Sequence, residues 1–159
     1  MNKYYMLSLL VIAAAHTVTM ATGEYSTMGA ETNPTHQSTP TNLSTADANA
    51  ITTGLKNINS NVSKYPVKKE NKANIQAALA QINTITGISV VNVNNSFGAI
   101  GTQIQSGQYV VAKGSSSGLL SKINTNIQQA TDATLKNSLT DAKNQLMSFN
   151  ATLDALSKL

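Results

Sequence analysis

The stretch "VVNVNNSFGAIGTQIQSGQYVV", residues 90–111, decides the fold class of this chain. It reads either as a strand that enters a glycine-rich turn or as one face of a helix. Residues on one face recur at alternating spacings of three and four: Val90, Val93, Phe97, Ile100, Ile104, Gly107 and Val111. This is the period of an amphipathic helix, whereas the alternation of a strand holds only near Val91 and Val93. We therefore expect a helix over residues 90–111, even though each interior glycine costs about 1 kcal/mol relative to alanine.

The glycines of "FGAIG", residues 97–101, do not belong to a nucleotide-binding motif. A dinucleotide fingerprint needs G-x-G-x-x-G between a strand and a helix, and a phosphate loop ends in G-K-[ST]. Residues 98–101 match the GXXG of a KH RNA-binding loop, but no basic residue stands inside or beside them. We expect Gly98 and Gly101 to leave the backbone bare, so that another helix packs closely there.

Two further helical patterns precede this stretch. The first begins at Ser44, with Asp47 three residues on as in a capping box, and ends by Tyr65 because Pro66 follows. Its apolar stripe consists of Ala48, Ile51, Leu55, Ile58, Val62 and Tyr65. The second covers residues 73–86 and stops at Gly87. Its apolar face consists of Ile75, Leu79, Ile82 and either Ile85 or Thr86.

The sequence after residue 111 predicts a loop and then a long helical region. "KGSSSG", residues 113–118, has the composition of a loop. One apolar register follows in Leu120, Ile123, Ile127 and Ala130, and another in Leu135, Leu139, Ala142, Leu146, Phe149, Leu153 and Leu156. The phase slips at residues 131–134, so either a turn capped by Thr131 or Asp132 separates two helices, or one helix carries a local shift. We favour the break, since a single helix would overhang its partners.

The first 44 residues divide into two segments that precede the helical patterns. Residues 1–23 have the features of a secretory signal peptide, with a short apolar run and small residues that permit cleavage after Ala21 or Gly23. The run is shorter than the roughly 20 residues that span a bilayer, although an uncleaved anchor remains the alternative. Residues 24–44 are rich in Ser, Thr and Pro without apolar periodicity, so we expect a disordered linker. This leaves residues 45–159 as one helical domain.

The composition argues against several classes of function. The chain has no cysteine, and all 11 of its basic residues are lysine. The absence of arginine, which binds phosphates and guanine edges bidentately, argues against nucleic-acid binding. Beyond the signal peptide the only histidine is His36, in the linker. A catalytic triad or a zinc site cannot be assembled around one imidazole in such a segment.

The carboxylates and the asparagines give no catalytic site either. Asp132, Asp141 and Asp154 are too far apart along a helix to form a two-carboxylate site, and we expect them to be solvated. We therefore predict no catalytic, cofactor-binding or metal-binding residue. Four sequons are candidate N-glycosylation sites, namely Asn42, Asn61, Asn94 and Asn150.

These observations predict an all-α fold, a small antiparallel bundle of four or five amphipathic helices after a disordered N-terminal segment. The function we expect is that of a secreted, extracellular and non-enzymatic structural or interaction module, without a cofactor. Its partner would be an extracellular protein or surface. The alternative is a carrier of a lipid-like ligand or a surface-active protein, in which the small side chains of "FGAIG" and "IQAALA" line a cavity instead of allowing close packing.

Overall fold

The computed structural model describes residues 41–159, and they contain helices but no strand, as predicted. The five α-helices of this part are α1 (Thr45–Val62), α2 (Lys72–Ala80), α3 (Val91–Gln105), α4 (Tyr109–Gln129) and α5 (Ala133–Ser157). Two short 3-10 turns, η1 (Lys69–Asn71) and η2 (Gln81–Thr84), flank α2. The predicted signal peptide, the linker up to residue 40, and His36 lie outside the described residues.

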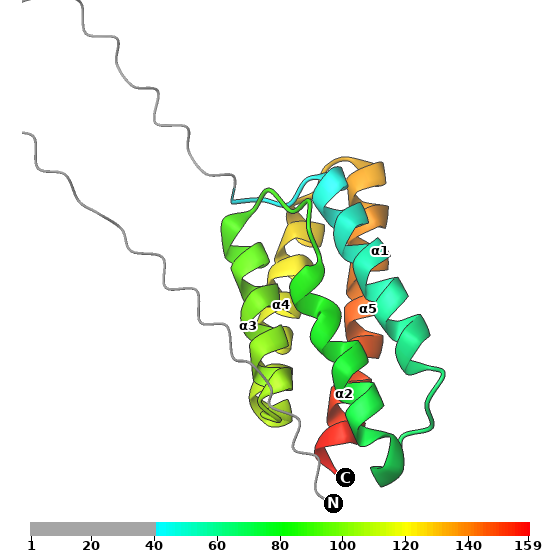
Figure 1. Ribbon diagram of the computed structural model, residues 1–159. Coiled ribbons are helices and arrows are strands. Elements are labelled where there is room, and N and C mark those ends of the chain that lie inside the picture. The colour runs from blue at the N-terminus through cyan, green and yellow to red at the C-terminus, as the bar shows by residue number, and fades with distance from the viewer. Residues whose placement is uncertain (1–40) are drawn as a thin grey trace, which may run out of the picture. The chain divides into compact units, whose positions relative to one another are not determined.

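Consecutive helices run in opposite directions, so the first and the last helix run in the same direction (Figure 1). α1 and α5 lie side by side, α4 packs against both α3 and α5, and α2 lies between α1 and α3. Asn59 of α1 ties the parallel pair together, because its Nδ2 donates to the carbonyl oxygen of Gln145 at 3.0 Å and to its Oε1 at 2.9 Å. The predicted all-α bundle is thus confirmed, with five helices.

α1 begins and ends where local chemistry requires. The Ser44 hydroxyl accepts from the backbone N–H of Asp47 at 3.1 Å, and the Asp47 carboxylate accepts from the backbone N–H of Ser44 at 2.8 Å, which completes the capping box. The predicted stripe from Ala48 to Val62 is buried. Tyr65 lies beyond the helix end at Val62 and is half-buried against the core.

The chain joins the core before the predicted start of the domain. Leu43, which the sequence assigned to the linker, is only 2% exposed and belongs to the core. Its backbone N–H donates to Oδ1 of the buried Asn126 on α4 at 2.8 Å, and Nδ2 of Asn126 donates to the carbonyl oxygen of Lys122 at 2.9 Å. A single side chain therefore satisfies a buried backbone donor and fixes the end of α4 against the start of α1.

The helix predicted over residues 73–86 is present as α2 followed by the 3-10 turn η2, which ends at Thr84. α2 tightens into η2, and Ile85 rather than Thr86 is the buried member of the ambiguous pair. Gly87 has a φ of 83°, a conformation that glycine adopts without strain. This residue turns the chain into the short extended segment that leads to α3.

α3 confirms the helical interpretation of residues 90–111 but is shorter than predicted. It ends at Gln105, and Gly107 has a φ of 72° in an exposed turn. Val111, expected on the buried face, lies in α4 and is 52% exposed. Gly107 takes the left-handed conformation in the turn between α3 and α4. The regular spacing that predicted one helix over residues 90–111 therefore continues from one helix into the next, which runs in the opposite direction.

The predicted loop at residues 113–118 is wrong, because α4 is continuous through it. Its inner face is Tyr109, Ala112, Ser116, Leu119, Ile123 and Asn126, at helical spacing throughout. Gly114 and Gly118 face outward, and a Cβ at either position would meet nothing within 4 Å. Packing of this inner face against α3 and α5 thus overrides the low helix propensity of glycine and serine.

The phase slip at residues 131–134 is a turn between two helices. α4 ends at Gln129 and α5 begins at Ala133, with Asp132 as the N-cap whose Oδ1 accepts from the backbone N–H of Leu135 at 2.7 Å. The break that we favoured is therefore confirmed. From Leu139 to Leu156 the predicted apolar register of α5 is buried without exception.

Close helix packing is found at one of the two glycines of "FGAIG". A Cβ on Gly101 would lie 2.6 Å from the Cβ of Asn83 and 3.1 Å from the carbonyl oxygen of Ala80. A Cβ on Gly98 would meet nothing within 4 Å. Gly101 thus lets α3 approach the end of α2, whereas Gly98 has no such role.

Candidate functional site

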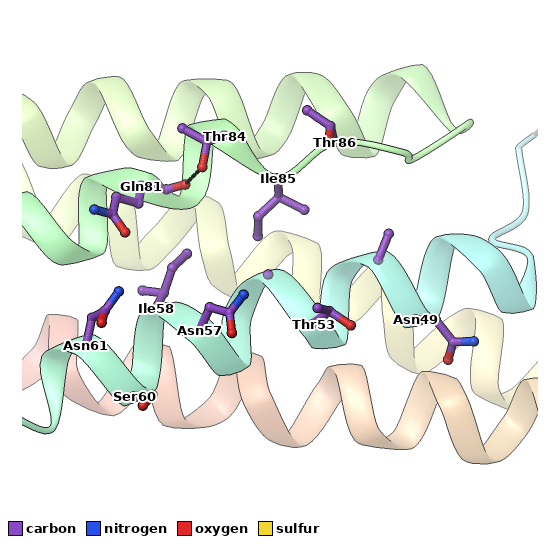
Figure 2. Close-up of a pocket in the computed structure, with 12 residues that line it drawn as sticks. Asn49, Thr53, Asn57, Ile58, Ser60, Asn61, Gln81, Thr84, Ile85 and Thr86 are labelled. Atoms are coloured by element: carbon purple, nitrogen blue, oxygen red, sulfur yellow. Dashed lines mark hydrogen bonds between the residues drawn. The ribbon is translucent and has the colours of Figure 1, made fainter.

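A groove lies between α1 and the segment 81–86, with a volume of about 760 Å³ (Figure 2). We call it the amide groove, because most of its lining consists of neutral amide and hydroxyl side chains. The lining residues are Asn49, Ala50, Thr53, Gly54, Asn57, Ile58, Ser60, Asn61, Gln81, Thr84, Ile85 and Thr86. It contains no carboxylate, imidazole or amine.

The α1 side of the amide groove follows from a polar repeat on that helix. Asn49, Thr53, Asn57 and Asn61 recur every fourth residue and so share one flank beside the buried stripe. This repeat was not among the predicted sites. The spacing was visible in the sequence, but the segment that faces it became apparent only from the fold.

The floor of the amide groove is apolar and closely packed. Ile85 reaches across from the extended segment to α1, where a Cβ on Gly54 would lie 2.6 Å from Cγ1 of Ile85. The absence of a side chain at Gly54 therefore lets Ile85 seat directly on the helix backbone. This contact sets the distance between the two walls.

The polar side chains of the amide groove have free hydrogen-bonding capacity. Within residues 41–159, the side chains of Asn49, Thr53, Asn57, Gln81 and Thr86 make no hydrogen bond. Two other lining residues are paired locally. Oδ1 of Asn61 accepts from Nζ of Lys64 at 2.9 Å, and Oγ1 of Thr84 donates to the carbonyl oxygen of Gln81 at 2.7 Å. Such a surface offers donors and acceptors to a neutral partner but no group that transfers a proton near neutral pH.

The four sequons lie in different surroundings. Asn42 and Asn94 are exposed, at the start of the domain and on α3. Asn61 is half-buried at one end of the amide groove, so a glycan there would compete with a ligand. The Oδ1 atom of Asn150 is buried without a hydrogen-bond partner in the described part of the chain. Glycosylation at each of the four stays a prediction.

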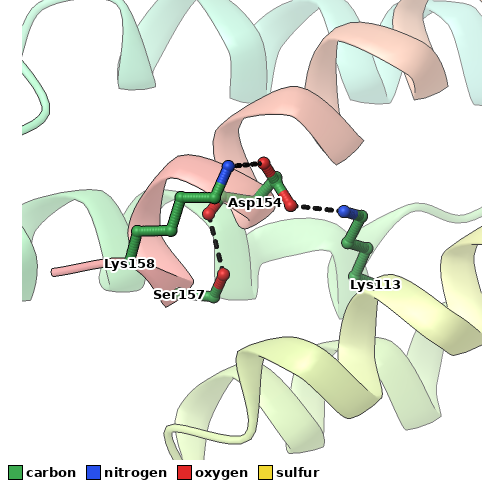
Figure 3. Close-up of polar contacts among 4 residues, drawn as sticks. All are labelled: Lys113, Asp154, Ser157 and Lys158. Atoms are coloured by element: carbon green, nitrogen blue, oxygen red, sulfur yellow. Dashed lines mark hydrogen bonds and ion pairs between the residues drawn. The ribbon is translucent and has the colours of Figure 1, made fainter.

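The three aspartates of α5 and its cap have separate roles. Asp132 caps the helix and Asp141 is exposed. Asp154, which we expected to be solvated, forms ion pairs with Lys113 of α4 and with Lys158 (Figure 3). Hydrogen bonds from Lys113 and then Lys158 lower the pKa of Asp154 to about 2.

Asp47 is the buried acid that the sequence suggested only as a helix cap. It is 1% exposed, and its oxygens accept from the hydroxyl of Ser44 at 2.6 Å, from the backbone N–H of Ser89 at 2.5 Å and from the Ser89 hydroxyl at 3.0 Å, besides the cap bond to the Ser44 N–H. Burial by itself would raise the pKa of Asp47, but these donated bonds outweigh it and hold the pKa below its ordinary value. Asp47 therefore joins α1 to the segment before α3 as a charged, fully bonded group.

In residues 41–159 no three metal-ligating side chains lie together. No helix within the same residues has the length and apolar character needed to cross a bilayer.

Comparison with known proteins provides no relative. No protein-family model, no curated protein and no solved structure matches this chain.

Proposed function

We propose that this chain is a secreted, non-enzymatic interaction module that binds an extracellular partner through the amide groove. The observation that supports this most directly is the row of Asn49, Thr53 and Asn57 on one flank of α1, opposite residues 81–86. Their side chains make no hydrogen bond within residues 41–159. The apolar run and small residues of segment 1–23 support export.

The partner that suits this surface is neutral and rich in hydrogen-bonding groups. Amides and hydroxyls discriminate by the direction of donors and acceptors, and a partner that leaves them unpaired after desolvation would lose affinity. Ile58 and Ile85 in the lining add a small apolar area. The combination favours recognition of a partner by shape and hydrogen bonds over attraction by charge.

Native mass spectrometry of the protein recovered from the medium of eukaryotic cells tests this proposal first. We expect the mass of a chain whose first residue is near Thr22 or Glu24, with or without glycans and with no other adduct. A stoichiometric adduct of lipid size would favour the carrier alternative instead. A mass that retains Met1 would contradict export.

Site-specific photo-crosslinking then tests the amide groove itself. One variant carries a photo-crosslinking residue in place of Asn57, which lines the groove. The matched control carries it in place of Asn137, which is exposed on α5. We expect a partner from the surrounding fluid to be captured from position 57 and not from position 137. If the partner is captured equally from both positions, or from neither, the amide groove is not the binding site.

A further inference from the structure

Lysines gather at one end of the bundle. The segment that joins α1 to α2 carries Lys64, Lys68 and Lys69, and Lys72 opens α2. This segment lies at the same end as the α3–α4 turn and the C-terminus (Figure 1). We call this region the lysine end, made of residues 63–72, 106–113 and 157–159.

The charges of the lysine end are mostly not neutralised by acids. In its first segment four lysines stand against Glu70 alone. In the described residues ion pairs join only Lys113 and Lys158 to Asp154. Lys64 is hydrogen-bonded to the neutral Asn61. The cluster therefore keeps a positive charge of several units at neutral pH.

The rest of the described domain is close to balanced. Asp154 is paired with two lysines of the lysine end. Apart from it, the rest holds four lysines, Lys56, Lys122, Lys136 and Lys143, and three aspartates, Asp47, Asp132 and Asp141. The mild net charge of the whole chain thus conceals a marked asymmetry along the bundle. Such an asymmetry orients a protein in the field of a negatively charged surface.

Exposed apolar side chains lie among these lysines. Val110 is 73% exposed, Val111 52% and Val67 41%, and they account for three of the five large exposed apolar residues of the described chain. Val110 and Val111 border a recess of about 340 Å³ together with Lys72 and Ser157. Nζ of Lys72 lies 5.3 Å from the centre of the Tyr109 ring, which holds that lysine beside the valines.

We propose that the lysine end docks on an anionic lipid surface, with Val67, Val110 and Val111 entering the headgroup region. Lysines on this end neutralise lipid headgroups, while the valines leave water. Both kinds of side chain are needed at one place for interfacial binding, because charge attraction alone is weak and easily screened by salt. This inference does not depend on the amide groove, which opens along the flank of α1.

The exposed valines distinguish a lipid surface from a soluble polyanion. A sulfated glycan would attract the lysines as strongly but offers no apolar layer for Val110 and Val111. Binding to a polyanion would therefore be weakened by lysine substitutions alone. Binding to a lipid surface would be weakened by substitutions of the lysines and of the valines.

Vesicle co-sedimentation of the protein recovered from the culture medium tests the proposal. Vesicles of phosphatidylcholine alone are compared with vesicles that also contain phosphatidylserine, at low and high salt. Binding is expected only with phosphatidylserine and is expected to weaken with salt. Lys68→Gln/Lys69→Gln should reduce the partition coefficient by about fivefold per lysine, roughly 25-fold in total.

Matched variants separate the two ingredients. Val110→Ser/Val111→Ser should also weaken vesicle binding severalfold, and Met147→Ser, a 50% exposed residue midway along α5, should not. Lys122→Gln/Lys136→Gln is the charge control on the balanced part of the domain. Because all of these positions are on the surface, circular dichroism should show unchanged folding.

Three outcomes would overturn the proposal. The first is an absence of binding to phosphatidylserine vesicles. The second is binding that the control substitutions weaken as much as those at the lysine end. The third is binding to vesicles and to heparin that depends on the lysines but not on the valines, which would indicate a polyanion site.

Discussion

The starts of α1 and α4 solve the same problem in different ways. α1 begins with a complete capping box, and its Asp47 also binds Ser89 from a distant segment. α4 begins at Tyr109 after Gln108, whose side chain makes no capping bond, and its next two residues are exposed valines. The first helix start is thus fixed by polar side chains, whereas the second is fixed by the backbone turn at Gly107 and by packing further along the helix.

The difference separates stability from surface function. Every polar atom of the Asp47 carboxylate is used inside the protein, so that corner has nothing left for a partner. At the start of α4, by contrast, Val110 and Val111 are exposed and border a recess together with Lys72 of α2. A helix start whose polar groups are all bonded within the protein contributes to stability. A helix start without a side-chain cap and with exposed side chains is available for binding.

The largest expected effect follows removal of the Asp47 carboxylate. Asp47→Ala removes the buried acceptor of the backbone N–H and hydroxyl donors of Ser44 and Ser89, and we expect a loss of about 3 kcal/mol in the free energy of unfolding. Urea denaturation measures it. Asp141→Ala, at an exposed position on α5, should change the same quantity by less than about 0.5 kcal/mol. Equal effects would show that the corner at α1 is not specially stabilised.

Acid should weaken the same corner. The pKa of Asp47 is lower in the folded protein than the unfolded value of about 3.9, so its contribution is present above that value and is lost as the pH falls through the folded pKa. Urea midpoints of the wild type and of Asp47→Ala should therefore converge below about pH 4. A constant difference at all pH values would mean that the carboxylate is not the source of the stability.

A side chain in the turn before α4 should lower the stability of the fold. Gly107→Ala places a Cβ at a φ of 72°, and we expect a loss of about 1 kcal/mol. Thermal unfolding followed by circular dichroism detects it. A neutral result would mean that the turn relaxes, and that packing alone fixes the start of α4.

The smallest expected effect is a gain in stability within α4. Gly114→Ala should stabilise by up to about 1 kcal/mol, because a Cβ there meets nothing within 4 Å and alanine is the better helix former. Gly98→Ala on α3 is a second open helical glycine and should behave alike. Because Gly98 lies in α3, a gain in Gly98→Ala together with a loss in Gly114→Ala would contradict the continuous helix that replaced the predicted loop.

The sequence predicted most of the fold because the apolar stripes have helical spacing. The stripe of α1 from Ala48 to Val62, the face of α2 and the register of α5 from Leu139 to Leu156 are buried as expected, whereas Tyr65 and Leu135 are half-buried. Two errors have one cause, since both arose where glycine and serine interrupt the apolar pattern. At Gly107 the chain turns, whereas at Gly114 and Gly118 the helix continues, and local composition does not distinguish these cases.

The candidate site was harder to predict than the fold. The polar repeat from Asn49 to Asn61 is visible in the sequence, but the opposing wall comes from residues 81–86, which reach α1 through the contact of Ile85 with Gly54. The bond from Ser89 to Asp47 likewise joins residues 42 positions apart. Long-range pairs of this kind depend on how the helices pack, which periodicity does not specify.

The parallel pairing of α1 and α5 has a mechanical consequence. The start of α1 lies at one end of the bundle and the C-terminus at the other (Figure 1). A force that stretches the domain between these points runs along the helix axes, so α1 and α5 must slide past each other as rods. Their interlocked side chains and the Asn59–Gln145 bonds then resist the load together. The domain bears tension in shear instead of unzipping helix by helix.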